Sequence, residues 1–257
     1  MREIVPVGTD RLSAEDSGGD GPPLVLLHPG VGDQRVWDGV WRPLAEHFRV
    51  VRYDFRGYGA SYPPTEPYSW LDDLRAVLAH FAIGSAHLVG TSQGGATALA
   101  LALEHPQAVR SLVLLAPAVG GWTPGGPPEI AARFAAALAS GDEDNLVALM
   151  LELWAAAGHE PVVEDLVRSG VRALRGETRF LRPLAPARHR LGEVVAPTLL
   201  LVGDRDFAPI VELDDEIAAR LPACRLERLA GVDHFPSLRV PALVVERIRG
   251  HCGQIAG

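Results

Sequence analysis

A glycine-flanked serine separates a buried strand from a buried helix in the first half of this chain. Residues 86–89 are mostly apolar and predict a short strand, and residues 95–103, rich in Ala and Leu, predict a helix. Between them lies the pentapeptide Gly90-Thr91-Ser92-Gln93-Gly94. A serine at such a sharp turn has a strained backbone and an exposed hydroxyl, and flanking glycines leave room for the turn. Because the following helix would favour negative charge at its N-terminus, Ser92 is a candidate nucleophile.

Strand-like and helical segments alternate on both sides of this turn. Strands are expected at 24–27, 49–53, 112–115, 198–202 and 225–229, and helices at 36–47, 70–81, 211–221 and 240–249. Continuous Val/Leu strands joined by helices are typical of an α/β fold with a mostly parallel central sheet and helices on both faces. A length of 257 residues suits one such domain. Ligands bind beyond the carboxyl ends of these strands, where Ser92 is expected to lie.

The alternation stops between residues 116 and 196, where the pattern becomes helical. A turn-rich linker at 122–128 precedes helical patterns at 129–139, 145–157 and 162–174. The strand pattern then resumes. We therefore interpret residues 119–191 as a small helical cap, or lid, inserted after the nucleophile-containing half. Residues 1–118 and 192–257 would form the core domain.

The composition excludes several classes of protein. A net charge of −8 argues against a nucleic-acid partner. The chain contains no Lys, which excludes Schiff-base lysine catalysis and lysine-containing phosphate loops and is common under GC-rich bacterial coding. Its two cysteines, Cys224 and Cys252, have neither disulfide-framework nor zinc-site spacing, so no metal is expected. With no signal-peptide pattern and no membrane-length apolar stretch, we expect a cytoplasmic protein without membrane contact.

A serine nucleophile needs a general base, and that base needs an orienting carboxylate. His234 directly follows the last predicted strand, where a base is required. The loop after the preceding strand contains Asp204 and Asp206, and either could be the acid.

This order of serine, acid and histidine, with its Gly-x-Ser-x-Gly turn, resembles the α/β-hydrolase fold family across nearly the whole chain. Residues 54–61, Asp-Phe-Arg-Gly-Tyr-Gly-Ala-Ser, match another segment of that family. The resemblance implies that Asp206, the last residue of a Gly-x-x-Asp turn, is the acid. The family usually has Gly directly before the histidine, whereas this chain has Asp233. An additional carboxylate there is expected to raise the pKa of the base.

The resemblance also implies an oxyanion hole built from two backbone N–H groups. Gln93, directly after the nucleophile, would supply one of them. Gly30 would supply the other, with Val31 as the alternative, because Pro29 replaces the usual glycine and cannot donate. His28 is expected to brace this loop.

The nucleophile type narrows the reaction. Family members with Asp at the turn, such as haloalkane dehalogenases and epoxide hydrolases, are excluded by Ser92. We expect a cofactor-independent serine hydrolase that acts on a small-molecule carboxylic ester or lactone through an acyl-enzyme. The alternatives are a C–C bond hydrolase of a diketone-like metabolite, a perhydrolase, and a non-hydrolytic ligand-binding or biosynthetic protein of the same fold.

Weaker patterns concern the substrate pocket. Val31, Trp122 and Trp154 are candidates to line it, and core packing is an equal alternative for Trp154. Arginines recur in the predicted cap at helical spacing, at Arg168, Arg172, Arg175, Arg179 and Arg182. We interpret them as a solvated surface, with recognition of an anionic substrate or carrier as the alternative.

Overall fold

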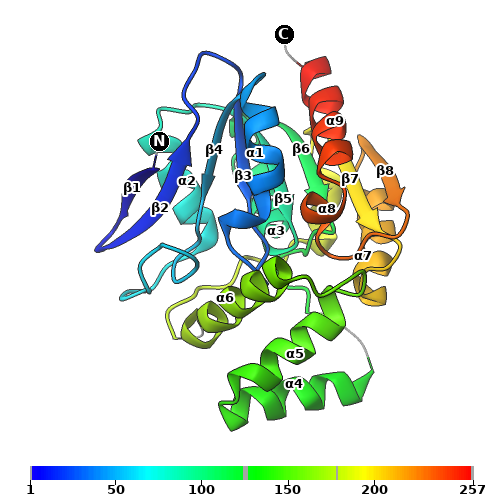
Figure 1. Cartoon of the computed structure of the whole chain (residues 1–257). Coiled ribbons are helices and arrows are strands. Elements are labelled where there is room, and N and C mark those ends of the chain that lie inside the picture. The colour runs from blue at the N-terminus through cyan, green and yellow to red at the C-terminus, as the bar shows by residue number, and fades with distance from the viewer. Residues whose placement is uncertain (1, 124–126, 178, 256–257) are drawn as a thin grey trace.

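A computed structural model describes residues 2–123, 127–177 and 179–255. Across these residues one eight-stranded sheet has the order β1-β2-β4-β3-β5-β6-β7-β8 (Figure 1). Strands β3 to β8 pair in parallel, as predicted, whereas β1 and β2 are antiparallel to their neighbours. The strands are β1 (Arg2–Val7), β2 (Asp10–Asp16), β3 (Pro23–Leu27), β4 (Arg49–Tyr53), β5 (Ala86–Thr91), β6 (Val109–Leu115), β7 (Thr198–Gly203) and β8 (Cys224–Leu229). The sequence pattern did not predict the hairpin of β1 and β2.

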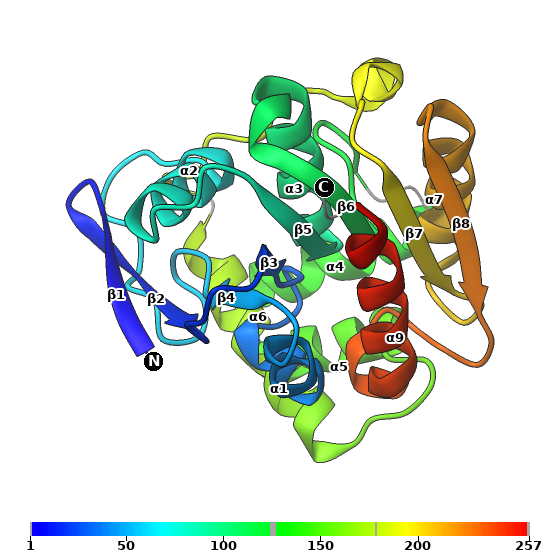
Figure 2. The ribbon, with the colours of Figure 1, turned by 90° about the horizontal axis from the view of Figure 1, so that it is seen from above.

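Helices cover both faces of the sheet, which confirms the predicted layering (Figure 2). Helices α1 (Asp38–Ala45) and α9 (Pro241–Cys252) lie on one face, and α2 (Trp70–His80), α3 (Gln93–Glu104) and α7 (Ala208–Arg220) lie on the other. Apolar side chains from each set bury against the sheet and form two core layers. The shorter elements are α8 (Pro236–Arg239), η1 (Gln34–Trp37), η2 (Pro106–Ala108), η3 (Arg188–Glu193) and η4 (Gly253–Ile255).

Three further helices lie between β6 and β7 and gather at one end of the sheet (Figure 1). They are α4 (Pro128–Ser140), α5 (Glu143–Trp154) and α6 (Pro161–Glu177), all within the segment predicted as a cap. Helix α6 approaches the loop after β3 closely, because a Cβ on Gly170 would lie 2.7 Å from the backbone nitrogen of Gly32. In the part of the chain that the structure describes, no helix is long and apolar enough to cross a membrane.

Candidate active site

Ser92 occupies a strained turn between β5 and α3. Its backbone has φ 51° and ψ −114°, a conformation that L-residues other than glycine adopt rarely. The flanking glycines are required by space. A Cβ on Gly90 would lie 2.5 Å from the carbonyl group of Gly94, and a Cβ on Gly94 would lie 2.2 Å from the carbonyl oxygen of Leu27. The sequence therefore forces Ser92 into a half-buried position at the edge of a cavity, where a nucleophile could reach a substrate.

His234 and Asp206 form a buried hydrogen-bonded pair. The imidazole Nδ1 of His234 lies 3.0 Å from Oδ1 and 2.9 Å from Oδ2 of Asp206, and both side chains are at most 1% exposed. The Asp206 carboxylate also accepts the Phe207 N–H at 2.7 Å. The exposed Asp204 instead accepts the Gly231 N–H at 2.7 Å. Of the two aspartates left open by the residue pattern, Asp206 is thus the one bonded to the imidazole.

The two loops that carry this pair meet at Gly203. A Cβ at that position would lie 2.0 Å from the carbonyl oxygen of Val232, so only glycine permits the approach. The backbone N–H of Arg205 also donates to the Val232 carbonyl at 2.9 Å. These contacts place the ends of β7 and β8 side by side and bring the carboxylate to the imidazole.

Ser92 and His234 line the same cavity, which has a volume of about 740 Å³. With Nδ1 bonded to Asp206, the Nε2 atom of His234 is the ring nitrogen available to the serine. Among the described residues the Ser92 hydroxyl makes no hydrogen bond. It is therefore not hydrogen-bonded to His234 in this structure. Such contacts are commonly long without substrate and tighten in the reacting complex.

The residues predicted for the oxyanion hole, Gly30 and Gln93, also border this cavity. Gln93 is the first residue of α3, so its backbone N–H has no acceptor within the helix. The Gln93 side chain fills the space beside Gly30, where a Cβ would lie 2.5 Å from Oε1. Val31, the alternative donor, is in the lining as well.

His28 braces the loop that carries Gly30. Its Nδ1 lies 2.8 Å from the Pro29 carbonyl oxygen, and its Nε2 accepts the Phe55 N–H at 3.0 Å. Burial lowers the pKa of His28 to about 4, so the ring is neutral at neutral pH. A neutral ring fits this pattern, in which one nitrogen donates and the other accepts.

The cavity wall is mostly apolar and includes the predicted Val31, Trp122 and Trp154. Trp154 serves both of its expected roles, because it packs in the core and its ring lies 4.5 Å from that of His234, centroid to centroid. Sequence reasoning did not single out four aromatic residues of this wall: Tyr58, Trp70, Phe134 and Phe207. Phe207 could have been found as the neighbour of Asp206, whereas the others depend on how distant segments pack.

Asp233 does not stand as a free charge beside the base. Its buried carboxylate pairs with Arg239 at 2.8 Å and accepts the backbone N–H of Ala157 at 3.0 Å. The carboxylate expected beside His234 is therefore present, and Arg239 offsets its charge.

The arginines of the insertion face acids or solvent. Arg168 pairs with Asp144 at 2.6 Å, and Arg172 pairs with Glu143 at 2.9 Å. Arg182 lies 3.4 Å from Asp72, and Arg179 lies over the ring of Phe180. None of these four borders the cavity, which fits a solvated surface. The side chain of Arg175 lies outside the described residues.

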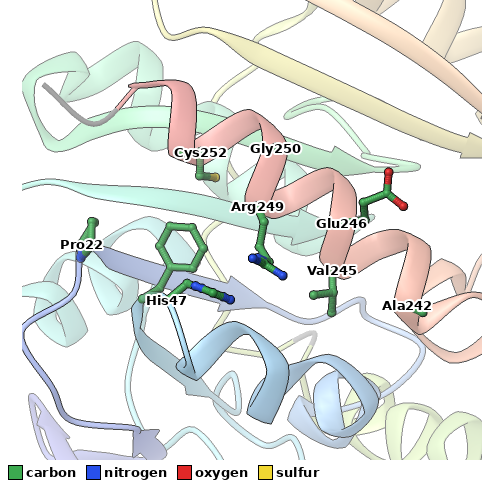
Figure 3. Close-up of a pocket in the computed structure, with 10 residues that line it drawn as sticks. Pro22, His47, Ala242, Val245, Glu246, Arg249, Gly250 and Cys252 are labelled. Carbon is green, nitrogen blue, oxygen red and sulfur yellow. The ribbon is translucent and has the colours of Figure 1, made fainter.

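A second cavity of about 670 Å³ lies between α9 and the segment before β4 (Figure 3). His47, Arg249 and Cys252 are in its lining, together with apolar residues. Burial raises the pKa of the Cys252 thiol to about 11, so the nucleophilic thiolate is scarce at neutral pH. None of the candidate catalytic residues borders this cavity.

Comparisons with known proteins agree with the fold. A model of the alpha/beta hydrolase fold matches residues 22–195. The chain is 33% identical over 240 residues to the pimeloyl-(acyl-carrier protein) methyl ester esterase of Methylococcus capsulatus, covering 87% of this chain and 91% of that enzyme. It is 27% identical over 253 residues to 3-oxoadipate enol-lactonase 1 of Acinetobacter baylyi, covering 93% and 92%. A solved N-acyl homoserine lactone degrading enzyme matches with a TM-score of 0.82 and 27% identity, over 96% of this chain and 99% of that one.

Proposed function

This chain belongs to the alpha/beta hydrolase fold family, and from that premise we propose that it is a serine hydrolase of carboxylic esters or lactones. One observation carries the proposal. A serine on a strained turn and a buried Asp–His pair border one apolar cavity. The similarity to an ester hydrolase and to two lactone hydrolases supports the same reaction class.

In the proposed mechanism Ser92 attacks the substrate carbonyl while Nε2 of His234 accepts the hydroxyl proton. Asp206 holds Nδ1 and stabilises the imidazolium that forms. The backbone N–H groups of Gly30 and Gln93 bind the developing oxyanion. His234 then gives its proton to the leaving alcohol, and a water molecule hydrolyses the acyl-enzyme. No cofactor takes part in this scheme.

The cavity lining supports an uncharged acyl group. No carboxylate or guanidinium side chain of the described residues borders the cavity. A carboxylate in the acyl chain would lose its hydration there without gaining an ionic partner, which is costly. Several aromatic and aliphatic side chains, among them Trp122, Phe134 and Met150, would instead contact an apolar chain.

Matched substrates test this proposal. Hexanoyl and octanoyl p-nitrophenyl esters and a neutral acyl lactone would be compared with a p-nitrophenyl monoester of adipic acid, which carries a free carboxylate of similar length. We expect the neutral substrates to be preferred by at least about tenfold in kcat/KM. Replacement Ser92→Ala should lower turnover by roughly 10⁴-fold or more. Hydrolysis that is unaffected by Ser92→Ala would refute the mechanism, and a preference for the anionic ester would refute the assigned acyl group.

A further inference from the structure

The loop that carries His234 is tied to the insertion by a buried ion pair. Arg239, the last residue of α8, directs Nε and Nη2 at the Asp233 carboxylate, with distances of 2.8 to 3.1 Å. The Asp233 side chain is fully buried and that of Arg239 is 11% exposed. A forked contact of this kind is strong and fixes the relative orientation of the two groups.

Both members of the pair also bond to the connection between α5 and α6. The Asp233 carboxylate accepts the N–H of Phe235 at 3.1 Å, within its own loop, and the N–H of Ala157 at 3.0 Å, in the connection between α5 and α6. Arg239 donates to the Gly158 carbonyl at 2.6 Å and to Glu160 of the same connection. The ion pair thus joins the segment around the base to the segment directly after α5.

This connection follows Trp154, which itself contacts the base. The backbone N–H of His234 donates to the backbone carbonyl of Trp154 at 3.2 Å. The centroids of the two rings lie 4.5 Å apart. A side chain of the cavity wall and the base are therefore held by one set of contacts. Neither Asp233 nor Arg239 borders the cavity, so neither can touch a substrate there.

The pair is also balanced in charge beside the imidazole. Asp233 directly precedes His234, and Arg239 offsets its negative charge at 2.8 Å. The other titratable groups around this loop are Asp206 on the imidazole, Asp214 of α7, and Glu160 with the neighbouring His159 in the α5–α6 connection. Burial, and then the charge of Asp206, raise the pKa of Asp214 well above its usual range. Glu160 is 56% exposed, so water screens it far more than it screens the buried Asp233.

We infer that Asp233 and Arg239 are positioning residues, which hold the His234 loop and Trp154 in register while cancelling each other's charge next to the base. This inference rests on the proposed function, because it assigns the pair a role in setting the catalytic imidazole.

The pH dependence of kcat/KM on a neutral ester separates positioning from simple structural support. Replacement Asp233→Asn leaves Arg239 with only the exposed Glu160 as an ionic partner, so its net positive field disfavours imidazolium and should lower the acidic midpoint. Replacement Arg239→Gln leaves the Asp233 charge uncompensated and should raise it. We expect the acidic midpoints of the two single variants to shift in opposite directions by about half a pH unit or more. The midpoint of the double variant should return toward the wild-type value.

Turnover at the optimum gives the second measurement. The double variant removes both buried charges and leaves neither one unpaired. Its free energy of unfolding should therefore be closer to the wild-type value than that of either single variant. Its kcat should nevertheless stay about tenfold low, since the forked pair no longer helps to hold the loop in register. Arg239→Lys keeps the charge without the fork and should retain the wild-type midpoint with a reduced kcat.

A matched control is the ion pair of Arg133 and Glu152, which joins α4 to α5 and is about half exposed. Replacement Arg133→Gln should leave both midpoint and kcat unchanged. The inference is overturned if folded Asp233→Asn and Arg239→Gln proteins keep the wild-type midpoint, or if the double variant regains full turnover. Failure of the proposed function is distinguishable, because then the wild-type protein itself would neither hydrolyse esters nor react with a fluorophosphonate.

Discussion

The indole of Trp154 packs against the imidazole of His234 with 4.5 Å between ring centroids and 43° between ring planes. The tryptophan ends α5 of the insertion, whereas the histidine belongs to the loop after β8. A wall of the cavity and the candidate base are therefore one packed unit. The insertion consequently does more than cover the site.

This packing predicts how replacements of Trp154 behave. Trp154→Ala removes a large buried ring and should lower the free energy of unfolding by about 3–5 kcal/mol. It should also lower kcat/KM for a medium-chain ester by about tenfold, because the base loses its support. Trp154→Phe keeps an aromatic ring and should retain most of both. Urea unfolding and steady-state kinetics check these outcomes; equal activity of both variants and the wild type would contradict the assigned contact.

The two aspartates after β7 predict a sharp difference. Asp206→Asn should lower kcat by about 10⁴-fold, because Asn no longer fixes the imidazole tautomer and does not stabilise imidazolium. Asp204→Asn should keep kcat within about threefold, because Asp204 bonds to the Gly231 N–H and not to the base. Similar losses in both variants would show that the carboxylate in contact with His234 has no special role.

Adding one methyl group at Gly94, in the turn that carries Ser92, should destabilise the protein. A Cβ there would meet the backbone of Leu27 at 2.2 Å, so Gly94→Ala should lower the free energy of unfolding by about 3 kcal/mol and reduce activity. Gly176 of α6 is the control, because a Cβ there meets nothing within 4 Å. Gly176→Ala should stabilise the protein by roughly 0.5–1 kcal/mol through helix propensity. Chemical denaturation measures both, and a tolerated Gly94→Ala would contradict the close approach.

The buried imidazole of His28 should make the protein less stable in acid. Its pKa is lowered from 6.5 to about 4 by burial, so between these pH values the unfolded chain binds more protons than the folded one. Stability should therefore fall as the pH falls through this window, with a contribution from His28 of about 3 kcal/mol. His28→Asn should weaken this pH dependence, measured as the free energy of unfolding at neutral pH and near pH 4.5. Replacement of the exposed His159 by Asn should not, and an unchanged dependence in His28→Asn would argue against a neutral buried ring.

The parallel sheet and the positions of the candidate catalytic residues could be predicted from local pattern. Continuous apolar runs mark the buried strands, and the bounds expected for β4, 49–53, are those observed. Ser92, Asp206 and His234 directly follow strands or lie in the loops after them, so their placement at one edge follows from topology.

The parts that were missed depend on partners distant in sequence. Strand β2 includes the buried polar residues Asp10 and Ser13, which blur its apolar alternation. Asp10 pairs with Arg56 at 2.8 Å, and the Ser13 N–H donates to Ser61 at 2.8 Å, contacts that no local window reveals. The pairing of Asp233 with Arg239 spans only 6 residues, and it was missed because it needs the four-residue helix α8 to turn the chain back.

Covalent capture of the nucleophile tests the central claim most directly. The wild-type protein would be treated with a fluorophosphonate, and its mass and the modified peptide would be determined by mass spectrometry. We predict one phosphonyl group per chain, attached to Ser92, and no adduct on folded Ser92→Ala. A folded wild-type protein that stays unmodified, or an adduct of equal yield on Ser92→Ala, would contradict the assignment of Ser92 as the nucleophile.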